Sequence, residues 1–257
     1  MTTVATASWL VRLSPVREQT VRLVCLPHAG GGSSTFRPLS GALPAWVDVL
    51  AARLPGRESR RREAPVLDLD VAVSALLDEL RVAPPLPTAM FGYCSGALLA
   101  HELAVRMSAE GRAPSVLFAC ASQAPHDYGR NRGVHAMSRA ELVAYLRGMN
   151  VMPASILDNA DLFDLFESAI RADFAMFETT NYRPTEALAI PLVAMGARGD
   201  SGVLFEDLIE WRHTGSGQFA VHMFTGGGHG FLTSAPATLA SVVSAALAAN
   251  APAASTR

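Results

Sequence analysis

The segment Gly92-Tyr93-Cys94-Ser95-Gly96 restricts the possible folds of this 257-residue chain more than any other feature. It matches the G-x-S-x-G pattern of a sharp turn between a strand and a helix, with cysteine at the centre. Such a turn holds its central residue in strained backbone and presents the side chain at the end of a sheet. The residues two before and two after must be very small, and both are glycine. The pattern therefore predicts that Cys94 is a nucleophile.

Strands and helices alternate around this turn. An apolar strand at 88–93 runs directly into Cys94, and a helix at 95–110 follows, with Gly111 as its terminator. Further apolar strands are predicted at 8–13, 21–26, 47–52, 115–121, 190–195 and 219–224, and further helices at 69–82, 204–211 and 238–248. This alternation indicates an α/β fold, with a mostly parallel central sheet flanked by helices on both faces.

Residues 124–184 break the alternation, because their signals are helical throughout. Ser138 and Glu141 form a capping box that would begin one helix. A second helix carries an apolar stripe made of Leu162, Phe166, Ile170, Phe174 and Phe177. We predict one domain over 1–257, with 124–184 as a helical lid inserted into it. Phe166, Phe174 and Phe177 are candidates to line a pocket under the lid, and plain helix packing is the alternative for each.

Two residues that follow late strands complete a catalytic triad. In sheets of this kind the order along the chain is nucleophile, acid, histidine. Asp200 follows the strand at 190–195, and His229 follows the strand at 219–224. His229 would act as general base, and Asp200 would orient its imidazole.

Other candidates are less favoured. Glu206 and Asp207 fall on a predicted helix, where a solvated face is expected. His101 is expected to pack on the helix after Cys94, and His222 lies inside a strand, where a core histidine is expected.

Other cysteines and serines are weaker candidates for the nucleophile. A turn centred on Ser95 would place the bulky Tyr93 where a very small residue is needed. Cys25 and Cys120 fall inside predicted strands, where small buried hydrophobic side chains are expected. We therefore prefer Cys94.

Two backbone amides are predicted to form an oxyanion hole, those of Ser95 and of Ala29 in the loop after strand 21–26. His28 in the same loop is a candidate for substrate contact. The run Gly30-Gly31-Gly32 is not a phosphate-binding loop, because it lacks the Gly-Lys-Ser/Thr ending and the chain has no lysine. The histidines are scattered without metal-ligand spacing, so we expect no metal and no cofactor.

Charge and composition argue against several classes of protein. A net charge of -2 does not suggest nucleic-acid binding. No stretch approaches the ~18 apolar residues of a membrane helix, and the N-terminus lacks the pattern of a signal peptide. Three cysteines are too few for a disulfide framework and fit a reducing compartment. We expect a cytoplasmic monomer that binds neither nucleic acid nor membrane.

Several segments together resemble the type II thioesterases that accompany polyketide synthases and nonribosomal peptide synthetases. The resemblance covers nearly the whole chain and is carried by Ser8-Trp9-Leu10, Leu26-Pro27-His28-Ala29-Gly30-Gly31, Leu54-Pro55-Gly56-Arg57-Glu58, Arg171-Ala172-Asp173-Phe174, Tyr182-Arg183-Pro184 and Gly227-Gly228-His229. It implies an α/β-hydrolase fold with a mobile lid, and a triad carried here by Cys94, Asp200 and His229. It also implies hydrolysis of acyl thioesters on the phosphopantetheine of an acyl or peptidyl carrier protein, or of acyl-CoA.

The turn around Cys94 departs from the family pattern in a way that bears on the reaction. The family usually has Gly-His-Ser-Met-Gly, whereas this chain has Tyr93, Cys94 and Ser95 at the inner positions. Acyl transfer from a carrier thiol to cysteine exchanges one thioester for another, so the acyl group stays activated. The alternative to a hydrolase is therefore an acyltransferase that passes the acyl group to an amine or another carrier thiol. A non-enzymatic binding protein is a third reading.

Four arginines form a basic cluster, namely Arg57, Arg60, Arg61 and Arg62. Such a cluster could dock an acidic carrier protein. The alternative is a solvated loop.

Overall fold

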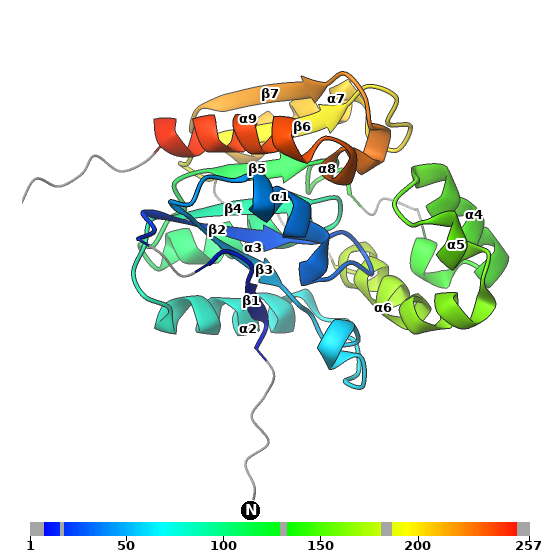
Figure 1. The fold of residues 1–257 in the computed structure, drawn as a ribbon. Helices are drawn as coiled ribbons and strands as arrows, with labels where there is room; N and C mark the ends of the chain where they lie inside the picture. Colours follow the sequence, from blue (N-terminus) through cyan, green and yellow to red (C-terminus); the bar gives the residue numbers. More distant parts are fainter. Residues whose placement is uncertain (1–7, 16–17, 129–132, 181–186, 251–257) are drawn as a thin grey trace, which may run out of the picture.

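Seven strands form one sheet in the computed structural model, which describes residues 8–15, 18–128, 133–180 and 187–250. Across the sheet they are β1 (Leu10–Arg12), β3 (Val47–Ala52), β2 (Val21–Leu26), β4 (Thr88–Tyr93), β5 (Leu117–Cys120), β6 (Leu192–Ala197) and β7 (Phe219–Phe224) (Figure 1). Strands β2 to β7 run parallel, and β1 is antiparallel to β3. Because parallel strands end at the same edge, the loops that follow them gather there.

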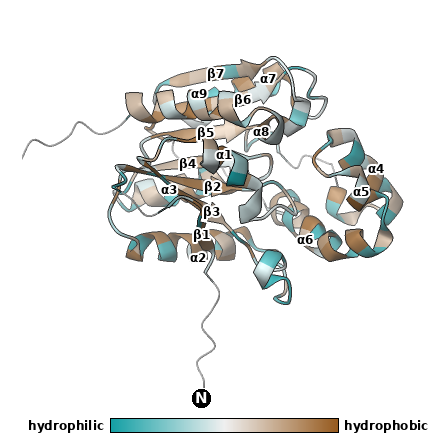
Figure 2. Ribbon diagram, in the orientation of Figure 1, coloured by the Kyte–Doolittle hydropathy of each residue, from teal (hydrophilic) through white to brown (hydrophobic). Residues whose placement is uncertain are grey.

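Helices cover both faces of the sheet, because its central strands are apolar on both sides. In β2, Val24 and Leu26 belong to one core, and Leu23 and Cys25 belong to the other. Figure 2 shows this apolar character as the brown colour of the central strands. The first core contains residues of α2 (Leu69–Val82), α3 (Gly96–Ala109) and α7 (Phe205–Ile209). The second contains residues of α1 (Arg37–Ala42), α8 (Phe231–Ser234) and α9 (Pro236–Ala249).

A helical insertion connects β5 to β6 and lies at one end of the sheet (Figure 1). It contains η3 (Val134–Ala136), α4 (Arg139–Met149), α5 (Ala154–Leu157) and α6 (Ala160–Glu178), and the predicted capping box begins α4. Its hydrophobic cluster includes Phe163, Ile170 and Phe174 of α6, together with Ala29 from the loop after β2. The predicted end of the insertion at 184 lies outside the described residues. The described part between 124 and 180 contains no strand, as predicted.

Most predicted elements are confirmed, and the differences have local causes. The bounds of β2, β3, β4, β7 and α2 are those predicted. Strand β6 begins two residues late, since Pro191 has no amide hydrogen to donate to the sheet. The predicted helix at 204–211 is α7 followed by the 3-10 helix η4 (Glu210–Thr214). Helix α9 begins early, at Pro236, since proline is favoured at the first helical position.

None of the helices in the described segments is by itself long and apolar enough to cross a membrane. The segments Gly228–Ser234 and Pro236–Ala249 reach that length and composition only as a pair, which is bent by 85°.

Candidate functional site

Cys94 occupies the sharp turn between β4 and α3, where its φ of 55° is one that few non-glycine residues adopt. The two flanking glycines are required by close backbone contacts. A Cβ atom on Gly92 would lie 2.3 Å from the Cα atom of Ala97, and one on Gly96 would lie 2.2 Å from the carbonyl oxygen of Leu26. Ser95 is the N-cap of α3, so its amide belongs to the group that has no acceptor within the helix. The turn thus presents a thiol beside an available amide.

His229 and Asp200 form a buried pair at the same edge of the sheet. The Nδ1 atom of His229 lies 2.8 Å from Oδ2 of Asp200. The second oxygen of Asp200, Oδ1, accepts hydrogen bonds from the amides of Gly202 (2.8 Å) and Val203 (3.2 Å). These amides fix the carboxylate, which in turn fixes the imidazole. Within the described residues Nε2 of His229 is buried without a hydrogen-bond partner, so this nitrogen can exchange a proton with a reacting group in the site.

The charge of its neighbours controls the protonation of His229. Burial lowers the pKa of His229. The charge of a Cys94 thiolate and the hydrogen bond to Asp200 raise it by more, so the pKa is about 10. Below that pH the imidazole of His229 is therefore protonated whenever Cys94 is ionised. A thiolate beside an imidazolium is the activated form of a cysteine nucleophile.

Tyr93 joins the nucleophile turn to the segment that carries His229. Its hydroxyl donates a hydrogen bond to the carbonyl oxygen of His229 and accepts one from the amide of Leu232 at 3.3 Å. Its ring is 2% exposed and packs against Phe231, with 5.2 Å between ring centroids. The sequence leaves open whether Tyr93 tunes the thiol or fits the turn, because its partners lie about 140 positions away along the chain. Tyr93 thus connects the turn that contains Cys94 to the segment that contains His229.

We expect Tyr93→Phe to lower the free energy of unfolding by about 1–3 kcal/mol, because it leaves a buried carbonyl and a buried amide without a partner. Urea unfolding of both proteins measures the difference. Equal unfolding free energies would show that these two hydrogen bonds contribute no stability.

The predicted oxyanion loop lies at the end of β2. The amide of Gly31 donates to the carbonyl oxygen of His28 at 2.8 Å, which fixes the peptide that contains the Ala29 amide. Nδ1 of His28 lies 3.0 Å from the carbonyl oxygen of Ala29. Burial lowers the pKa of His28, so the ring is neutral at neutral pH. Because a carbonyl oxygen can only accept, Nδ1 of His28 carries the proton.

A small pocket lies over Cys94 and is closed by the insertion. Its lining includes Cys94 and His229, together with Tyr145, Met149 and Phe174 of the insertion. Its volume of about 10 Å³ is close to the minimum that holds one water molecule.

Only part of the predicted aromatic lining faces this pocket. Phe174 lines it, whereas Phe166 packs against the hydrophobic cluster of the insertion. Phe177 belongs to a core of the sheet, where its ring packs against Tyr128 at 5.9 Å. For these two residues plain helix packing was the better reading.

Two predictions about charged residues need correction. Arg57 is 5% exposed and bonded to Asp173, and Arg60 is 4% exposed, with its guanidinium 4.6 Å from the ring of Trp9. Two of the four arginines of the predicted cluster are therefore buried. They can neither dock a carrier protein nor belong to a solvated loop. Sequence analysis could not find their partners, since Asp173 lies 116 positions away from Arg57.

The remaining histidine candidates lie away from the triad. His101 is buried against Trp211, as predicted, with 6.1 Å between ring centroids. His222 is only partly buried, because it lies on the edge strand β7, where it packs against Phe224. The prediction of a core histidine at position 222 was wrong.

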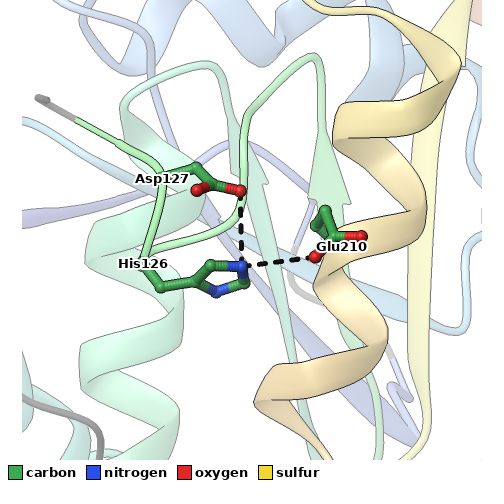
Figure 3. Close-up of side chains that lie close together, drawn as sticks. All are labelled: His126, Asp127 and Glu210. Atoms are coloured by element: carbon green, nitrogen blue, oxygen red, sulfur yellow. Dashed lines mark ion pairs between the residues drawn. The ribbon is translucent and has the colours of Figure 1, made fainter.

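Among the described residues, one group of side chains could hold a metal ion, although the sequence suggested none. His126 and Asp127, at the start of the insertion, face Glu210 of η4 (Figure 3). Nε2 of His126 lies 3.3 Å from Asp127 Oδ2 and 3.5 Å from Glu210 Oε2. All three are partly exposed, and the same contacts are ion pairs when His126 is protonated. With the nearby hydrogen bond from Trp211 to the carbonyl of Ser122 (2.9 Å), they tie the start of the insertion to η4.

The family model and several of the similar proteins are thioesterases. Residues 21–247 match the family model described as the thioesterase domain. A probable cadicidin biosynthesis thioesterase of Streptomyces griseus is 33% identical over 88% of this chain and 62% of that protein. The AMB antimetabolite synthetase AmbE of Pseudomonas aeruginosa is 35% identical over 96% of this chain, which corresponds to only 12% of the synthetase. The chain therefore spans less than two thirds of each of these two relatives.

Two solved thioesterase structures superpose on this chain over nearly their whole length. The type II thioesterase BorB from the borrelidin biosynthetic cluster superposes with a TM-score of 0.85 and 33% identity, over 94% of this chain and 99% of that one. The RedJ thioesterase from the prodiginine pathway of Streptomyces coelicolor gives a TM-score of 0.82 and 32% identity, over 91% and 95%. This chain has the α/β-hydrolase fold and belongs to the thioesterase family.

Proposed function

We propose that this protein is a type II thioesterase that hydrolyses acyl thioesters on carrier-protein phosphopantetheine, through an acyl intermediate on Cys94. The observation that carries the proposal is the placement of Cys94 in the strained turn beside His229, whose imidazole is held by Asp200 at 2.8 Å. The fold of BorB and RedJ, both named as thioesterases, supports the reaction class. The insertion is the lid, and the whole chain acts as one unit.

The first half of the reaction forms the acyl-enzyme. The Cys94 thiolate attacks the carbonyl carbon of the thioester, and the negative oxygen is held by the amides of Ala29 and Ser95. The tetrahedral adduct then collapses and breaks the bond to the carrier sulfur. His229 gives its Nε2 proton to the leaving thiolate, so the carrier thiol departs neutral. Asp200 stabilises the imidazolium until that proton is transferred.

The second half returns the enzyme to its starting state. Neutral His229 accepts a proton from water at Nε2, and the oxygen of that water attacks the acyl carbon. Collapse of the second adduct releases the carboxylic acid and restores the Cys94 thiolate beside the imidazolium. The pocket over Cys94 is too small for a long acyl chain, so we expect the lid to move before substrate enters.

The relatives support a setting in polyketide or nonribosomal peptide biosynthesis. GrsT, a gramicidin S biosynthesis protein of Aneurinibacillus migulanus, is 31% identical over 85% of this chain and 86% of that protein. The probable thioesterase of Streptomyces griseus is likewise named for a biosynthetic pathway. The partner would then be an acyl or peptidyl carrier protein that presents the thioester on its phosphopantetheine arm.

Intact mass spectrometry of the protein after incubation with acyl-carrier thioesters tests the proposal. We expect free carboxylic acid to accumulate without any acceptor other than water, and Cys94→Ala to abolish it. If no thioester is hydrolysed above the rate of the Cys94→Ala variant, the proposed function is wrong.

The same experiment decides between water and another acceptor. An acyl-cysteine is itself a thioester and stays reactive toward amines and thiols. An adduct on Cys94 that persists in water and is discharged only by an added amine or thiol would establish an acyltransferase instead.

Met149→Ala is expected to widen the acceptance of acyl chains, because this side chain of α4 lines the pocket over Cys94. We expect kcat/KM for a longer acyl group, relative to acetyl, to rise by roughly 10-fold or more. Steady-state kinetics with a series of acyl thioesters measures this ratio.

Met152→Ala is the matched control, since Met152 packs against the hydrophobic cluster of the insertion instead. If both variants change the ratio alike, loosening of the lid and not the shape of the pocket is responsible.

A further inference from the structure

A buried ion pair connects the lid helix α6 to the predicted oxyanion loop. Arg57 donates to Asp173 through two hydrogen bonds, Nη1 to Oδ2 at 2.6 Å and Nη2 to Oδ1 at 2.8 Å. Each side chain is 4% exposed. The two motifs that contain them were singled out in the sequence, yet neither residue takes part in the chemistry of the triad. Their position next to the loop of Ala29 suggests what they do.

Asp173 also holds the oxyanion loop directly. Its Oδ2 atom accepts a hydrogen bond from the amide of Gly30 at 2.7 Å. The carbonyl oxygen of the same peptide, that of Ala29, is held by Nδ1 of His28 at 3.0 Å. Arg57 donates to the carbonyl of the following residue, Gly31, at 3.0 Å. The Ala29–Gly30 peptide is therefore fixed at both its donor and its acceptor.

This anchoring sets the direction of the Ala29 amide. A peptide unit is planar and trans, so its N–H points opposite to its C=O. The carbonyl of the His28–Ala29 peptide points at the amide of Gly31, at 2.8 Å, and the Ala29 amide must therefore point the other way. The next peptide in the chain is the one that Asp173 and His28 hold. Rotation of either peptide would break a bond in this set.

Packing holds the loop against α6 as well. Gly30 has a φ of +74°, and a Cβ atom there would lie 2.3 Å from Cγ1 of Ile170, one turn before Asp173 on α6. Ala29 belongs to the hydrophobic cluster of the insertion and not to either core of the sheet. The oxyanion loop is thus part of the packing of the lid.

We propose that Asp173 is a positioning residue that holds the Ala29 amide in its oxyanion-stabilising orientation, so that the hole is intact only while α6 is docked. The inference rests on the proposed function, since it assigns a role in the same acyl transfer. Arg57 balances the charge of the buried carboxylate, and its Nη1 atom donates to the same Oδ2 atom that accepts from the Gly30 amide. If α6 moved away from the loop, the Ala29 amide would lose its fixed orientation. During catalysis α6 therefore stays in contact with the loop, and other parts of the lid move to admit substrate.

Two double variants separate the hydrogen bond to Gly30 from the ion pair. Arg57→Met with Asp173→Leu removes both charges and the acceptor for Gly30. Arg57→Met with Asp173→Asn removes both charges but keeps a carbonyl oxygen at nearly the same place. Because neither variant leaves an unpaired buried ion, both are expected to fold. The Asn side chain keeps an oxygen acceptor for the Gly30 amide and also adds an NH₂ group, whereas the Leu side chain has neither.

Two rates are measured in each variant: acylation of Cys94 by a thioester, and alkylation of Cys94 by iodoacetamide. Alkylation needs the thiolate but forms no oxyanion. We expect the Leu variant to be acylated roughly 10- to 100-fold more slowly than the Asn variant. We expect the two alkylation rates to agree within about threefold. Hydrogen exchange of residues 28–31, followed by mass spectrometry, should be faster in the Leu variant.

The outcomes distinguish the inference from the proposed function. Equal acylation rates and equal exchange in the two variants, in a protein whose wild type hydrolyses thioesters, would overturn the role of Asp173. A parallel loss of acylation and alkylation would also overturn it, because it would show a general disturbance of the site. A wild type that hydrolyses no thioester would refute the proposed function, and unchanged exchange would still refute the anchoring by Asp173.

Discussion

Replacement of Cys94 by alanine is expected to reduce thioester hydrolysis by roughly 10⁴- to 10⁶-fold, the largest effect of any single change in this chain. In the proposed mechanism the Cys94 thiolate forms the covalent bond to the acyl group. Ser95 is the N-cap of α3 and lies one residue beyond the strained turn position that Cys94 occupies. Single-turnover kinetics with an acyl-carrier substrate measures the loss.

The other cysteines supply a matched control for this experiment. Cys25 is fully buried in β2, and burial raises the pKa of its thiol far above the ordinary value. Cys25→Ala should therefore leave the rate almost unchanged. Comparable losses in both variants would point to a folding defect, and a Cys94→Ala protein that keeps most of its rate would remove Cys94 from the mechanism.

The parts of the fold that sequence predicts well are those governed by local chemistry. Helix α2 runs over 69–82 as predicted, with Asp68 accepting from the amides of its first turn. The nucleophile turn was readable for the same reason, since the close contacts of Gly92 and Gly96 admit no larger residue. Asp200 and His229 could be chosen because parallel strands must end at one edge, and the structure brings them together there.

Residues whose roles depend on a distant partner could not be predicted from the sequence. Arg57 was predicted to be one of four clustered basic residues, whereas the structure pairs it with Asp173. The sequence leaves open whether Tyr93 tunes the thiol or fits the turn, and the structure places its hydroxyl against the carbonyl of His229. Periodicity places Phe177 on the same stripe as Phe174, yet the two face different cores. In each case the local pattern was correct and the tertiary contact decided the function.

Asp200→Asn is expected to lower kcat by roughly 10³- to 10⁴-fold, by imposing the wrong tautomer on His229. The amides of Gly202 and Val203 both donate to Oδ1 of Asp200, so the carbonyl oxygen of an asparagine would be held at that position. Its NH₂ group would then face Nδ1 of His229 and donate to it. The imidazole proton would be left on Nε2, where the base must instead accept a proton.

Glu206→Gln is the matched control, because Glu206 is an exposed acid on α7 that follows Asp200 closely in sequence. It should leave kcat unchanged. Equal activity of Asp200→Asn and wild type would show that His229 needs no carboxylate partner.

Asp200→Asn should also shift the dependence of the rate on pH. The pKa of His229 is raised to about 10, against burial, by the Cys94 thiolate and the bond to Asp200. A raised pKa keeps the imidazolium protonated to higher pH, so the wild-type rate should fall only as pH rises through about 10. Loss of the Asp200 carboxylate removes one of the groups that raise this pKa, and the alkaline fall should move to lower pH. NMR titration of the imidazole in both proteins tests the direction, and an unchanged pKa would mean that the thiolate alone sustains the ion pair.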